Sequence, residues 1–466
     1  MITLSKTKLE KINTIFASII KEVSPTPEEL ELVARYSNEI VSRLKAVVPN
    51  DVEILATGSI AHGTQVKNSY DIDLFLLFPR NLSRKELEKR GLEYAKWIVN
   101  EKKNESYIIK YAEHPYVKLI LKDLGTTADI VPAYKIKNAS ERITAVDRSQ
   151  LHNEFINEHL TKEQKNEVRV LKTFLKSHYI YGSDVKTEGF SGYLCEILIY
   201  TYGSLLNLFS HFYNMDIPVV IDPLNKIIYE RDSTETKVLT KKFNSEFIVI
   251  DPVDQNRNVA AVVSKESLAK FIFAVRYFLN NPLTATFYGQ KFSDLYSKQK
   301  VKNFSKKLGL SIFVLHFKVP NIAEDILWQQ IKKLKGTISD ALKKHGFTPV
   351  LSLENIFVDD GIIAFFINDI KIKYSIINGP QVYMYEAFDK FLKAHKTSLG
   401  FIFESDKIQS IEEAKYTDAK EIIINLIKNT ELPSYLKKEN LKIYKDNIPE
   451  NIAKLIYSAF ITKTLH

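Results

Sequence analysis

The chain has 466 residues, of which 45% are hydrophobic and 26% are charged. Since domains mostly span ~100–200 residues, this length predicts about three or four domains. The composition is typical of a chain with real hydrophobic cores, and it excludes whole-chain disorder, collagen and coiled coil. Lysine and arginine number 65 against 56 aspartate and glutamate residues, so the net charge is +9. This mild basic excess favours an acidic partner such as nucleic acid only weakly.

The single cysteine, Cys195, excludes an internal disulfide framework and a zinc site built from several thiolates. Its neighbours form an apolar helical pattern, which favours a buried packing residue over a nucleophile. The residues up to Val23 mix lysines with isolated apolar side chains, a pattern of neither a signal peptide nor a membrane span. We therefore expect a cytoplasmic protein in a reducing compartment, with no membrane partner.

The first third of the chain has the pattern of an α+β domain that ends near residue 150. Thr26, Pro27 and Glu29 form a capping box that separates two amphipathic helices, and Ser83 with Glu86 begins a third. Short apolar or alternating runs predict the strands. The expected elements are helices over 8–23, 27–47 and 84–103, and strands over 52–56, 71–78, 107–112, 116–122 and 127–133.

The remainder of the chain changes character twice. From Lys162 to Tyr179 and from Tyr193 to Phe212 the periodicity is helical, which predicts a mostly helical second domain that ends near Phe278. Beyond it, strands are expected over 310–318, 355–367 and 370–377, with helices over 322–344 and 386–395. The stretch from Ile411 onward reads as helical and rich in lysine.

The residues with the clearest chemical pattern are Asp71 and Asp73, which lie two apart on a predicted strand and so project from the same face. Two carboxylates held this close are unfavourable unless a cation lies between them. Gly58 and Ser59 form a turn just upstream that suits a phosphate, and Asp129 lies on the last predicted strand of the domain. Three carboxylates could hold two Mg²⁺ ions about 3.5–4 Å apart, an arrangement that suits nucleotidyl transfer.

A bare Asp-x-Asp has other interpretations. It also occurs at solvated strand ends, in manganese sites of glycosyltransferases and as the nucleophile pair of haloacid-dehalogenase phosphatases. An EF-hand loop is excluded, because the glycine at position 6 and the glutamate at position 12 of that loop are missing. The Gly-Ser turn at this spacing and the distal Asp129 favour the nucleotidyl-transfer interpretation.

Together, Gly58-Ser59, Asp71-x-Asp73 and Asp129 resemble the signature of the DNA polymerase β-like nucleotidyltransferase superfamily. The motifs GSIAHGT (58–64), DIDLFLLFP (71–79), YAEHPY (111–116), AVDR (145–148) and GFSGYLCE (189–196) resemble the archaeal, class I CCA-adding enzymes more narrowly. The resemblance implies an α+β multidomain protein with a polymerase β-like head, a helical neck, and an α/β body and tail. On this analogy the head is 1–150, the neck 151–278, the body 279–405 and the helical tail region 406–466.

The resemblance also implies an activity, its substrates and its partners. Enzymes of this family add or repair the 3′-terminal CCA of tRNA from CTP and ATP, with Mg²⁺, without a nucleic-acid template and with release of pyrophosphate. The implied partner is tRNA, bound at its acceptor and T arms by the body and tail. A homodimer is left open.

Site residues follow from the resemblance position by position. Asp71, Asp73 and Asp129 match the metal-binding catalytic carboxylates, and Asp129 also matches the position that activates the primer hydroxyl. The matches to nucleotide-binding positions are Ser59, His152, Lys172 and Tyr181, with Arg257 at the position that reads the incoming base. His62 departs from the family, because many relatives have arginine there, where it clamps the triphosphate. We therefore expect His62→Arg to lower the KM for nucleotides.

Two other functions remain open at this stage. A poly(A) polymerase or an oligoadenylate synthetase-like enzyme would keep the fold and change the product. An inactive RNA-binding module that uses the basic body and tail is a third hypothesis, although all three acidic positions are intact.

Overall fold

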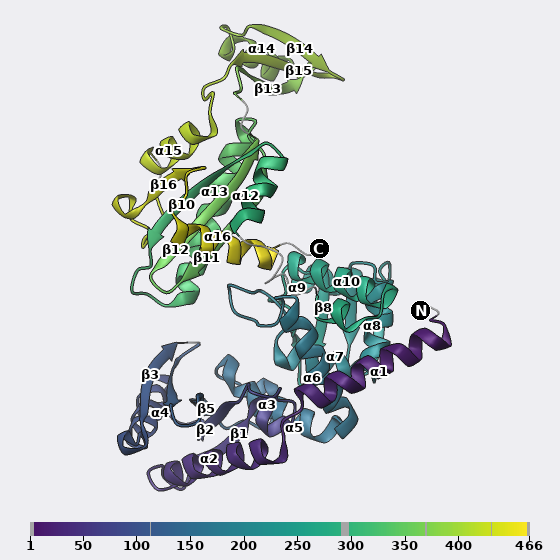
Figure 1. Ribbon diagram of the computed structural model, residues 1–466, viewed down its shortest axis with the longest axis vertical. Coiled ribbons are helices and arrows are strands. Elements are labelled where there is room, and N and C mark those ends of the chain that lie inside the picture. Colours follow the sequence, from purple (N-terminus) through teal and green to yellow (C-terminus); the bar gives the residue numbers. More distant parts are fainter. Residues whose placement is uncertain (1–3, 112, 290–297, 369–370, 430, 464–466) are drawn as a thin grey trace. The chain divides into compact units, whose positions relative to one another are not determined.

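The computed structural model describes residues 4–111, 113–289, 298–368, 371–429 and 431–463. The chain divides into two compact units, Met1–Gln290 and Lys291–His466 (Figure 1). The fold is a multidomain α+β arrangement, as the sequence predicted. No helix among these residues combines the length and the apolar composition that a membrane span requires.

The first unit begins with a five-stranded sheet, which we call the N-terminal sheet. Its strand order is β1-β2-β5-β4-β3, and only β2 and β5 run parallel to each other. Leu74 and Leu76 of β2 face a core formed with helices α2 and α4, whereas Phe75 and Leu77 are buried on the opposite face. The elements are α2 (Pro27–Lys45), β1 (Glu53–Thr57), α3 (Gly58–His62), β2 (Asp71–Phe78), α4 (Arg84–Trp97), β3 (Glu105–Tyr111), β4 (Pro115–Leu121) and β5 (Thr126–Tyr134). The strand expected over 107–112 is β3, and Ala112 lies outside the described residues.

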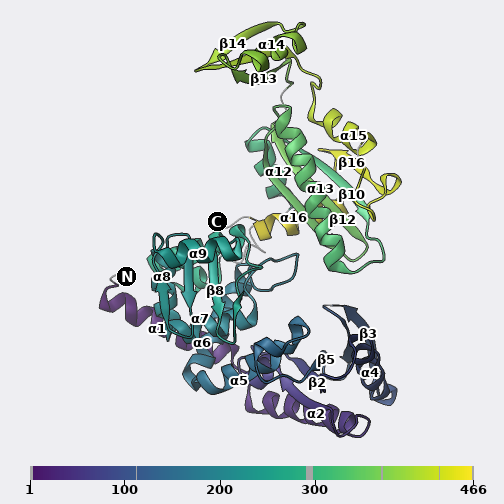
Figure 2. The ribbon, with the colours of Figure 1, turned by 180° about the vertical axis from the view of Figure 1, so that it is seen from behind.

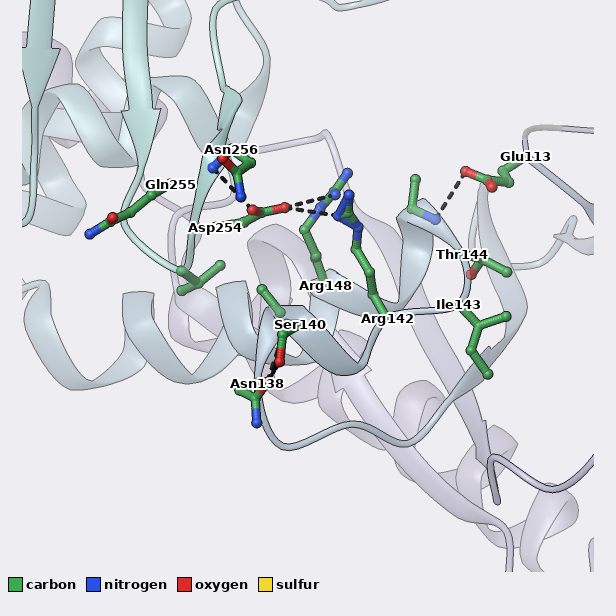
Figure 3. A pocket seen from close by; sticks show the side chains of 13 residues that line it. Glu113, Asn138, Ser140, Arg142, Ile143, Thr144, Arg148, Asp254, Gln255 and Asn256 are labelled. Carbon is green, nitrogen blue, oxygen red and sulfur yellow. Dashed lines mark hydrogen bonds and ion pairs between the residues drawn. The ribbon is translucent and has the colours of Figure 1, made fainter.

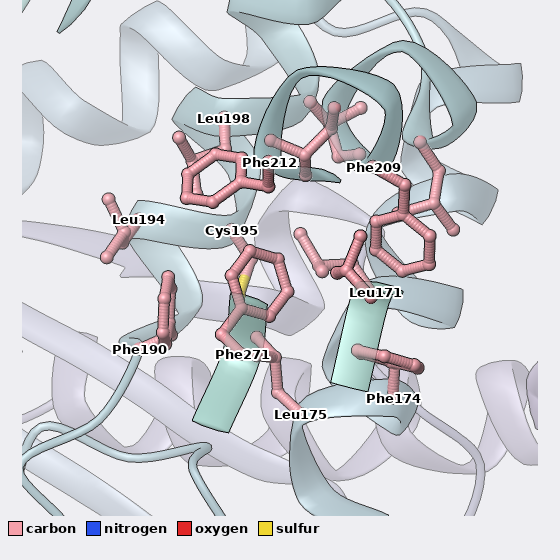
Figure 4. Close-up of a cluster of buried hydrophobic side chains, with 14 of the residues drawn as sticks. Leu171, Phe174, Leu175, Phe190, Leu194, Cys195, Leu198, Phe209, Phe212 and Phe271 are labelled. Atoms are coloured by element: carbon pink, nitrogen blue, oxygen red, sulfur yellow. The ribbon is translucent and has the colours of Figure 1, made fainter. Parts of the chain in front are cut away.

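A second core, which we call the helical core, fills the rest of this unit (Figure 4). Its buried side chains come largely from α6, α7, α8 and α10, and Cys195 lies among them with no exposed surface, as expected of a packing residue. The elements are α1 (Lys6–Val23), α5 (Ser149–His159), α6 (Lys162–Ser177), α7 (Gly192–Tyr202), α8 (Leu205–Tyr213), α9 (Thr234–Phe243), α10 (Lys265–Asn280) and α11 (Thr284–Phe287).

Three features of this unit differ from the predicted head and neck. Helix α1 was assigned to the head, yet its apolar stripe, which includes Ile12 and Ile19, is buried in the helical core. The neck also contains a four-stranded sheet of order β7-β6-β8-β9, with β6 Val219–Asp222, β7 Ile227–Tyr229, β8 Phe247–Asp251 and β9 Asp254–Asn258. Its strands have three to five residues, too few to show a clear period. The predicted boundary at residue 278 falls inside α10.

The second unit is built on a sheet of order β11-β12-β10-β16. Alternate side chains of β10 and β12 face α13 and α15 on one side and α12 and α16 on the other, so helices cover both faces of the sheet. The elements are α12 (Lys298–Lys307), β10 (Leu310–Lys318), α13 (Glu324–Lys344), β11 (Pro349–Phe357), β12 (Asp360–Asn368), α15 (Ala419–Asn429), β16 (Lys442–Lys445) and α16 (Glu450–Lys463). The single strand expected over 355–367 is wrong, because the chain turns between β11 and β12.

A small three-stranded sheet of order β13-β15-β14 with one helix, α14, is inserted between β12 and α15 (Figure 2). Its elements are β13 (Tyr374–Gln381), α14 (Tyr385–Ala394), β14 (Gly400–Glu404) and β15 (Lys407–Glu413). Ile370, where a strand was expected to begin, lies outside the described residues. The boundary proposed between 405 and 406 would separate β14 from β15, which pair as a hairpin. The stretch after Ile411 is not purely helical, since β16 returns to pair with β10.

Candidate functional site

The three predicted metal-binding carboxylates lie at one edge of the N-terminal sheet. In the parallel pairing of β2 with β5, Asp73 lies directly opposite Asp129 and Asp71 lies opposite Thr127. The Thr127 hydroxyl donates a hydrogen bond of 3.2 Å to Asp71 Oδ1. The parallel register therefore brings together residues more than 50 positions apart in the chain.

Gly58 and Ser59 begin α3, directly after β1, and the preceding Thr57 pairs with Asp73. Gly58 has a φ of +73°, and a Cβ at this position would lie 2.0 Å from Asp73 Oδ2. The backbone of the Gly-Ser turn thus packs directly against the Asp73 carboxylate. Ser59 is partly exposed in the first turn of α3, beside the carboxylates.

Burial and charge repulsion perturb the carboxyl groups of Asp73 and Asp129. Burial, with the nearby charges of Asp129 and Asp71, raises the pKa of Asp73 to about 7. Burial also raises the pKa of Asp129, against the opposing effect of Lys118, whose Nζ lies 2.6 Å from Asp129 Oδ1. Such shifts are frequent at catalytic and metal-binding sites.

The donor chemistry of this edge fits a hard divalent cation, since carboxylate oxygens are the ligands that Mg²⁺ prefers. In the part of the chain that the structure describes, no three His, Cys, Asp or Glu side chains converge in a geometry that would hold a metal ion. At Asp129, the Lys118 ammonium contacts an oxygen that a metal ion would need. Asp73 and Asp129 are adjacent in the pairing of β2 with β5, and Lys118 supplies a positive charge beside Asp129.

Two of the predicted nucleotide-binding residues, His62 and Lys172, meet in a buried cluster that we call the Glu196 network. Glu196 Oε2 lies 3.0 Å from His62 Nδ1, and Glu196 Oε1 lies 3.6 Å from Lys172 Nζ. Thr64 donates its hydroxyl proton to Glu196 and accepts a hydrogen bond of 3.0 Å from Lys172. His62, Lys172 and Glu196 are 5%, 2% and 2% exposed, so this network is closed to bulk water.

Tyr181 lies beside the Glu196 network, near Gly192, which is the first residue of α7. A Cβ added to Gly192 would lie 3.2 Å from Tyr181 Oη and 3.6 Å from Lys172 Nζ, so both polar atoms border the space beside this glycine. Burial raises the pKa of Tyr181, and the charges of Glu196, Asp71 and Asp73 act in the same direction. Tyr181 and Lys172 therefore lie together, within electrostatic range of the sheet-edge carboxylates.

His152 and Arg257 belong to a different cluster, centred on Asp251. His152 Nε2 and Arg257 Nη1 both contact Asp251 Oδ2, at 2.9 and 2.7 Å. Tyr193 donates its hydroxyl proton to the other oxygen at 3.1 Å, and its ring stacks on His152 with centroids 4.0 Å apart. Although burial opposes ionisation, His152 and Arg257 lower the pKa of Asp251 to about 2. The guanidinium of Arg257 is thus fixed by a buried, charged carboxylate.

A polar cavity of about 840 Å³ lies beside this cluster (Figure 3). Arg142 and Arg148 point toward Asp254 and contact its Oδ2 at 3.2 and 3.0 Å. Glu113 of the predicted YAEHPY motif accepts a hydrogen bond from the backbone of Ala145 at the rim. The volume of this cavity is in the usual range for a small-molecule site.

The structure places the predicted residues in three groups, which are the sheet-edge carboxylates with Ser59, the Glu196 network with Tyr181, and the Asp251 cluster. Tyr193 and Glu196, three positions apart on α7, contact Asp251 and His62, so this helix links the last two groups. Sequence reasoning missed Lys118, Tyr193, Asp251 and Glu196 as polar partners. Glu196 had a visible signal, an acidic residue in an otherwise apolar helical run, whereas Lys118 had none.

Comparisons with known proteins show the family of the chain. Residues 37–152 match a nucleotidyltransferase domain, residues 166–288 the second domain of tRNA nucleotidyltransferase, and residues 308–438 the C-terminal domain of the CCA-adding enzyme. The CCA-adding enzyme of Methanocaldococcus jannaschii is 35% identical over 94% of this chain and 96% of its own length. That of Methanococcus maripaludis is 36% identical over 92% of this chain and 96% of its own length.

Among solved structures, that of the Cid1 poly(U) polymerase with Mg 3′-dATP superposes with a TM-score of 0.48 at 15% identity, over 60% of this chain and 98% of its own. The two sequence relatives span nearly the whole chain at more than 30% identity, and three family domains follow one another in its sequence. The chain belongs to the family of CCA-adding enzymes.

Proposed function

We propose that this protein adds and repairs the 3′-terminal CCA of tRNA, using CTP and ATP and releasing pyrophosphate, without a nucleic-acid template. The family supports an enzyme that transfers nucleotides to tRNA. The single observation that carries the proposal is the parallel register that places Asp73 opposite Asp129, with the Gly58-Ser59 turn packed on Asp73. It brings together carboxylates that could hold the paired divalent ions used in nucleotidyl transfer.

Asp71, Asp73 and Asp129 would hold the divalent cation, for which we propose two Mg²⁺ ions. When bound, the ions supply a Lewis acid that favours the ionised primer hydroxyl and stabilises charge on the pyrophosphate. The protein's own task is to keep the three carboxylates together and to accept the proton of the primer 3′-hydroxyl, which we assign to Asp129. Lys118 must leave Asp129 Oδ1 for this role, since its ammonium contacts that oxygen.

The remaining predicted residues form the nucleotide site in this proposal. Ser59 and Tyr181 donate hydroxyl hydrogen bonds to the triphosphate, and His62 and Lys172 contribute positive charge or N–H donors. Arg257, held by Asp251, presents guanidinium donors to the incoming base, and His152 supports the same carboxylate. The closed Glu196 network implies that nucleotide binding requires local rearrangement around Lys172.

In this proposal, the second unit contacts tRNA at the acceptor and T arms of the tRNA. The homodimer and the cytoplasmic location stay predictions of the sequence. The division into head, neck, body and tail also stays a proposal, with α1 joined to the neck and the β14–β15 hairpin kept in one domain.

The product distinguishes this function from a poly(A) polymerase or an oligoadenylate synthetase-like activity. The test supplies tRNA that lacks its CCA end with CTP alone, ATP alone or both, in Mg²⁺ and then in chelator. We expect two C additions, one A addition and arrest, all dependent on metal. Long adenylate tails or 2′-linked oligomers would replace the proposed function with one of these alternatives.

A further inference from the structure

Glu196 is a buried carboxylate to which sequence reasoning assigned no role. It lies on α7, and it is 2% exposed. Burial alone would raise its pKa, but the Lys172 ammonium and the hydrogen bonds from His62 and Thr64 lower it to about 2. An ionised carboxylate is kept in a protein interior only where charged or donating partners compensate for lost hydration.

The partners of Glu196 come from both parts of the first unit. His62 and Thr64 lie at and just after the end of α3, which lies between β1 and β2 of the N-terminal sheet, whereas Lys172 lies on α6 in the helical core. The Thr64 hydroxyl donates to Glu196 and accepts from Lys172, so one carboxylate fixes the direction of every hydrogen bond in the network. Its two charged or titratable partners are both predicted nucleotide-binding residues.

Glu196 also decides which nitrogen of His62 stays available. An ionised carboxylate can only accept, so the proton shared with Glu196 lies on His62 Nδ1. Nε2 is the remaining nitrogen, and it has no hydrogen-bond partner among the described residues. It donates to a phosphate oxygen only in the imidazolium form, in which both ring nitrogens carry a proton. His62 is close enough to Asp73 to lower the pKa of that carboxyl group, so the free nitrogen belongs to a ring beside the sheet-edge carboxylates.

Arg169 holds the same segment in a different way. Its guanidinium donates to the backbone carbonyl of Gln65 at 2.8 Å and to that of Gly63, without contact with His62 or Lys172. The segment 62–65 is therefore anchored to the helical core by its backbone through Arg169, and by its side chains through Glu196. Arg169 therefore attaches the segment to the helical core, whereas Glu196 orients the polar side chains of the segment.

We propose that Glu196 is a positioning residue of the nucleotide site, which orients the His62 imidazole and the Lys172 ammonium toward the triphosphate of CTP and ATP. This inference rests on the proposed function. Without the carboxylate, the His62 ring loses the acceptor that orients its Nδ1–H, and the Lys172 ammonium loses its orienting acceptor. Nucleotide affinity then falls, while the surfaces that bind tRNA stay unchanged.

The test compares Glu196→Gln with the unmodified protein, and uses Glu167→Gln as the matched control. Glu167 lies on α6, is partly buried and interacts with the backbone of Leu205, away from the predicted site. For Glu196→Gln we expect the Kd for CTP, measured by calorimetry, and the KM for CTP and ATP to rise about tenfold or more, with the KM for tRNA changed less than about twofold. Glu167→Gln should change none of these values by more than about twofold.

Thermal unfolding separates positioning from folding. If Glu196→Gln does not fold, Thr64→Val removes the bridging hydroxyl alone and should raise the Kd for CTP in the same direction. A folded variant that binds CTP as tightly as the unmodified protein overturns the inference, as does an equal loss of tRNA and CTP affinity. Calorimetry with CTP needs no tRNA, so it tests the role of Glu196 separately from CCA addition. An unmodified protein that binds CTP but adds no CCA would contradict the proposed function, and the Kd of Glu196→Gln for CTP would still test the role of Glu196.

Discussion

Asp73 Oδ2 lies 2.0 Å from the point where a Cβ on Gly58 would be, and Gly58 has a φ of +73°. A side chain at position 58 would therefore strain the backbone and displace the carboxylate. We expect Gly58→Ala to lower the free energy of unfolding by about 1–3 kcal/mol and nucleotide incorporation by at least about tenfold. Chemical denaturation and incorporation assays on the purified variant measure the two effects.

Gly125→Ala is the control for backbone strain alone. Gly125 has a φ of +65° in the turn between β4 and β5, and a Cβ there would meet no atom within 4 Å. The two variants should lose similar stability from the backbone, whereas only Gly58→Ala should lose incorporation. Equal activity in both would show that the Gly58 contact with Asp73 has no part in catalysis.

The raised pKa of Asp73 predicts a pH dependence of metal binding. Its pKa is about 7 in the folded protein against an ordinary 3.8, so the fold retains a proton that the unfolded chain loses. Asp73 therefore contributes a loss of stability to the metal-free protein as the pH rises from about 4 to about 7. Because Mg²⁺ needs the ionised carboxylate, the increase in Tm caused by Mg²⁺ should be larger at about pH 8 than at about pH 5.5. An Mg²⁺ effect that is equal at both pH values, or unchanged in Asp73→Asn, would count against this assignment.

Lys118 competes with a metal ion for Asp129. Its Nζ lies 2.6 Å from Asp129 Oδ1 and 3.4 Å from Thr127 Oγ1, within the carboxylate edge. Removing this ammonium in Lys118→Met should increase Mn²⁺ affinity about three- to tenfold, as measured by electron paramagnetic resonance. Lys122→Met removes an exposed cation from the same part of the sheet and should leave the affinity unchanged. Weaker Mn²⁺ binding in Lys118→Met would mean that the lysine supports the metal site.

Arg257 should affect the choice of base more than the chemistry. Its Nη1 contacts the buried Asp251 at 2.7 Å, which leaves other guanidinium N–H groups for a base. In Arg257→Lys the charge stays but the planar fork of donors is lost. We expect kcat/KM for CTP and for ATP to fall by unequal factors, of about 10 to 100, in steady-state assays. Parallel decreases for both nucleotides would indicate a general electrostatic role.

Local signals were enough to predict the elements around the carboxylates. The capping box at Thr26 and the apolar run that follows Asp73 are both present as expected. The alternation of β2 also placed Asp71 and Asp73 on one face, because a strand has a strict period of two. The pairing of Asp73 with Asp129 depends on the order of strands, which periodicity does not give. The motif resemblance only grouped Asp129 with the other metal-binding positions.

The sequence could not predict which distant elements pack against each other. Helix α1 has the same amphipathic pattern as α2, and nothing in that pattern tells which core its stripe will join. In the sequence, Lys118 occupies an ordinary position of an alternating strand. Only the pairing of β4 with β5 shows that Lys118 lies opposite Asp129. Glu196 likewise acquires its partners only after α3, α6 and α7 come together.

The most direct test of the central claim is incorporation of labelled CTP and ATP into tRNA without its CCA end. The assay compares the unmodified protein with Asp73→Asn and with the exposed control Asp51→Asn. We predict that the unmodified protein and Asp51→Asn add two C residues and one A and then stop. Asp73→Asn should bind the same tRNA but incorporate nucleotides more than about 100-fold more slowly. Full incorporation by Asp73→Asn would contradict the assignment of the catalytic carboxylates.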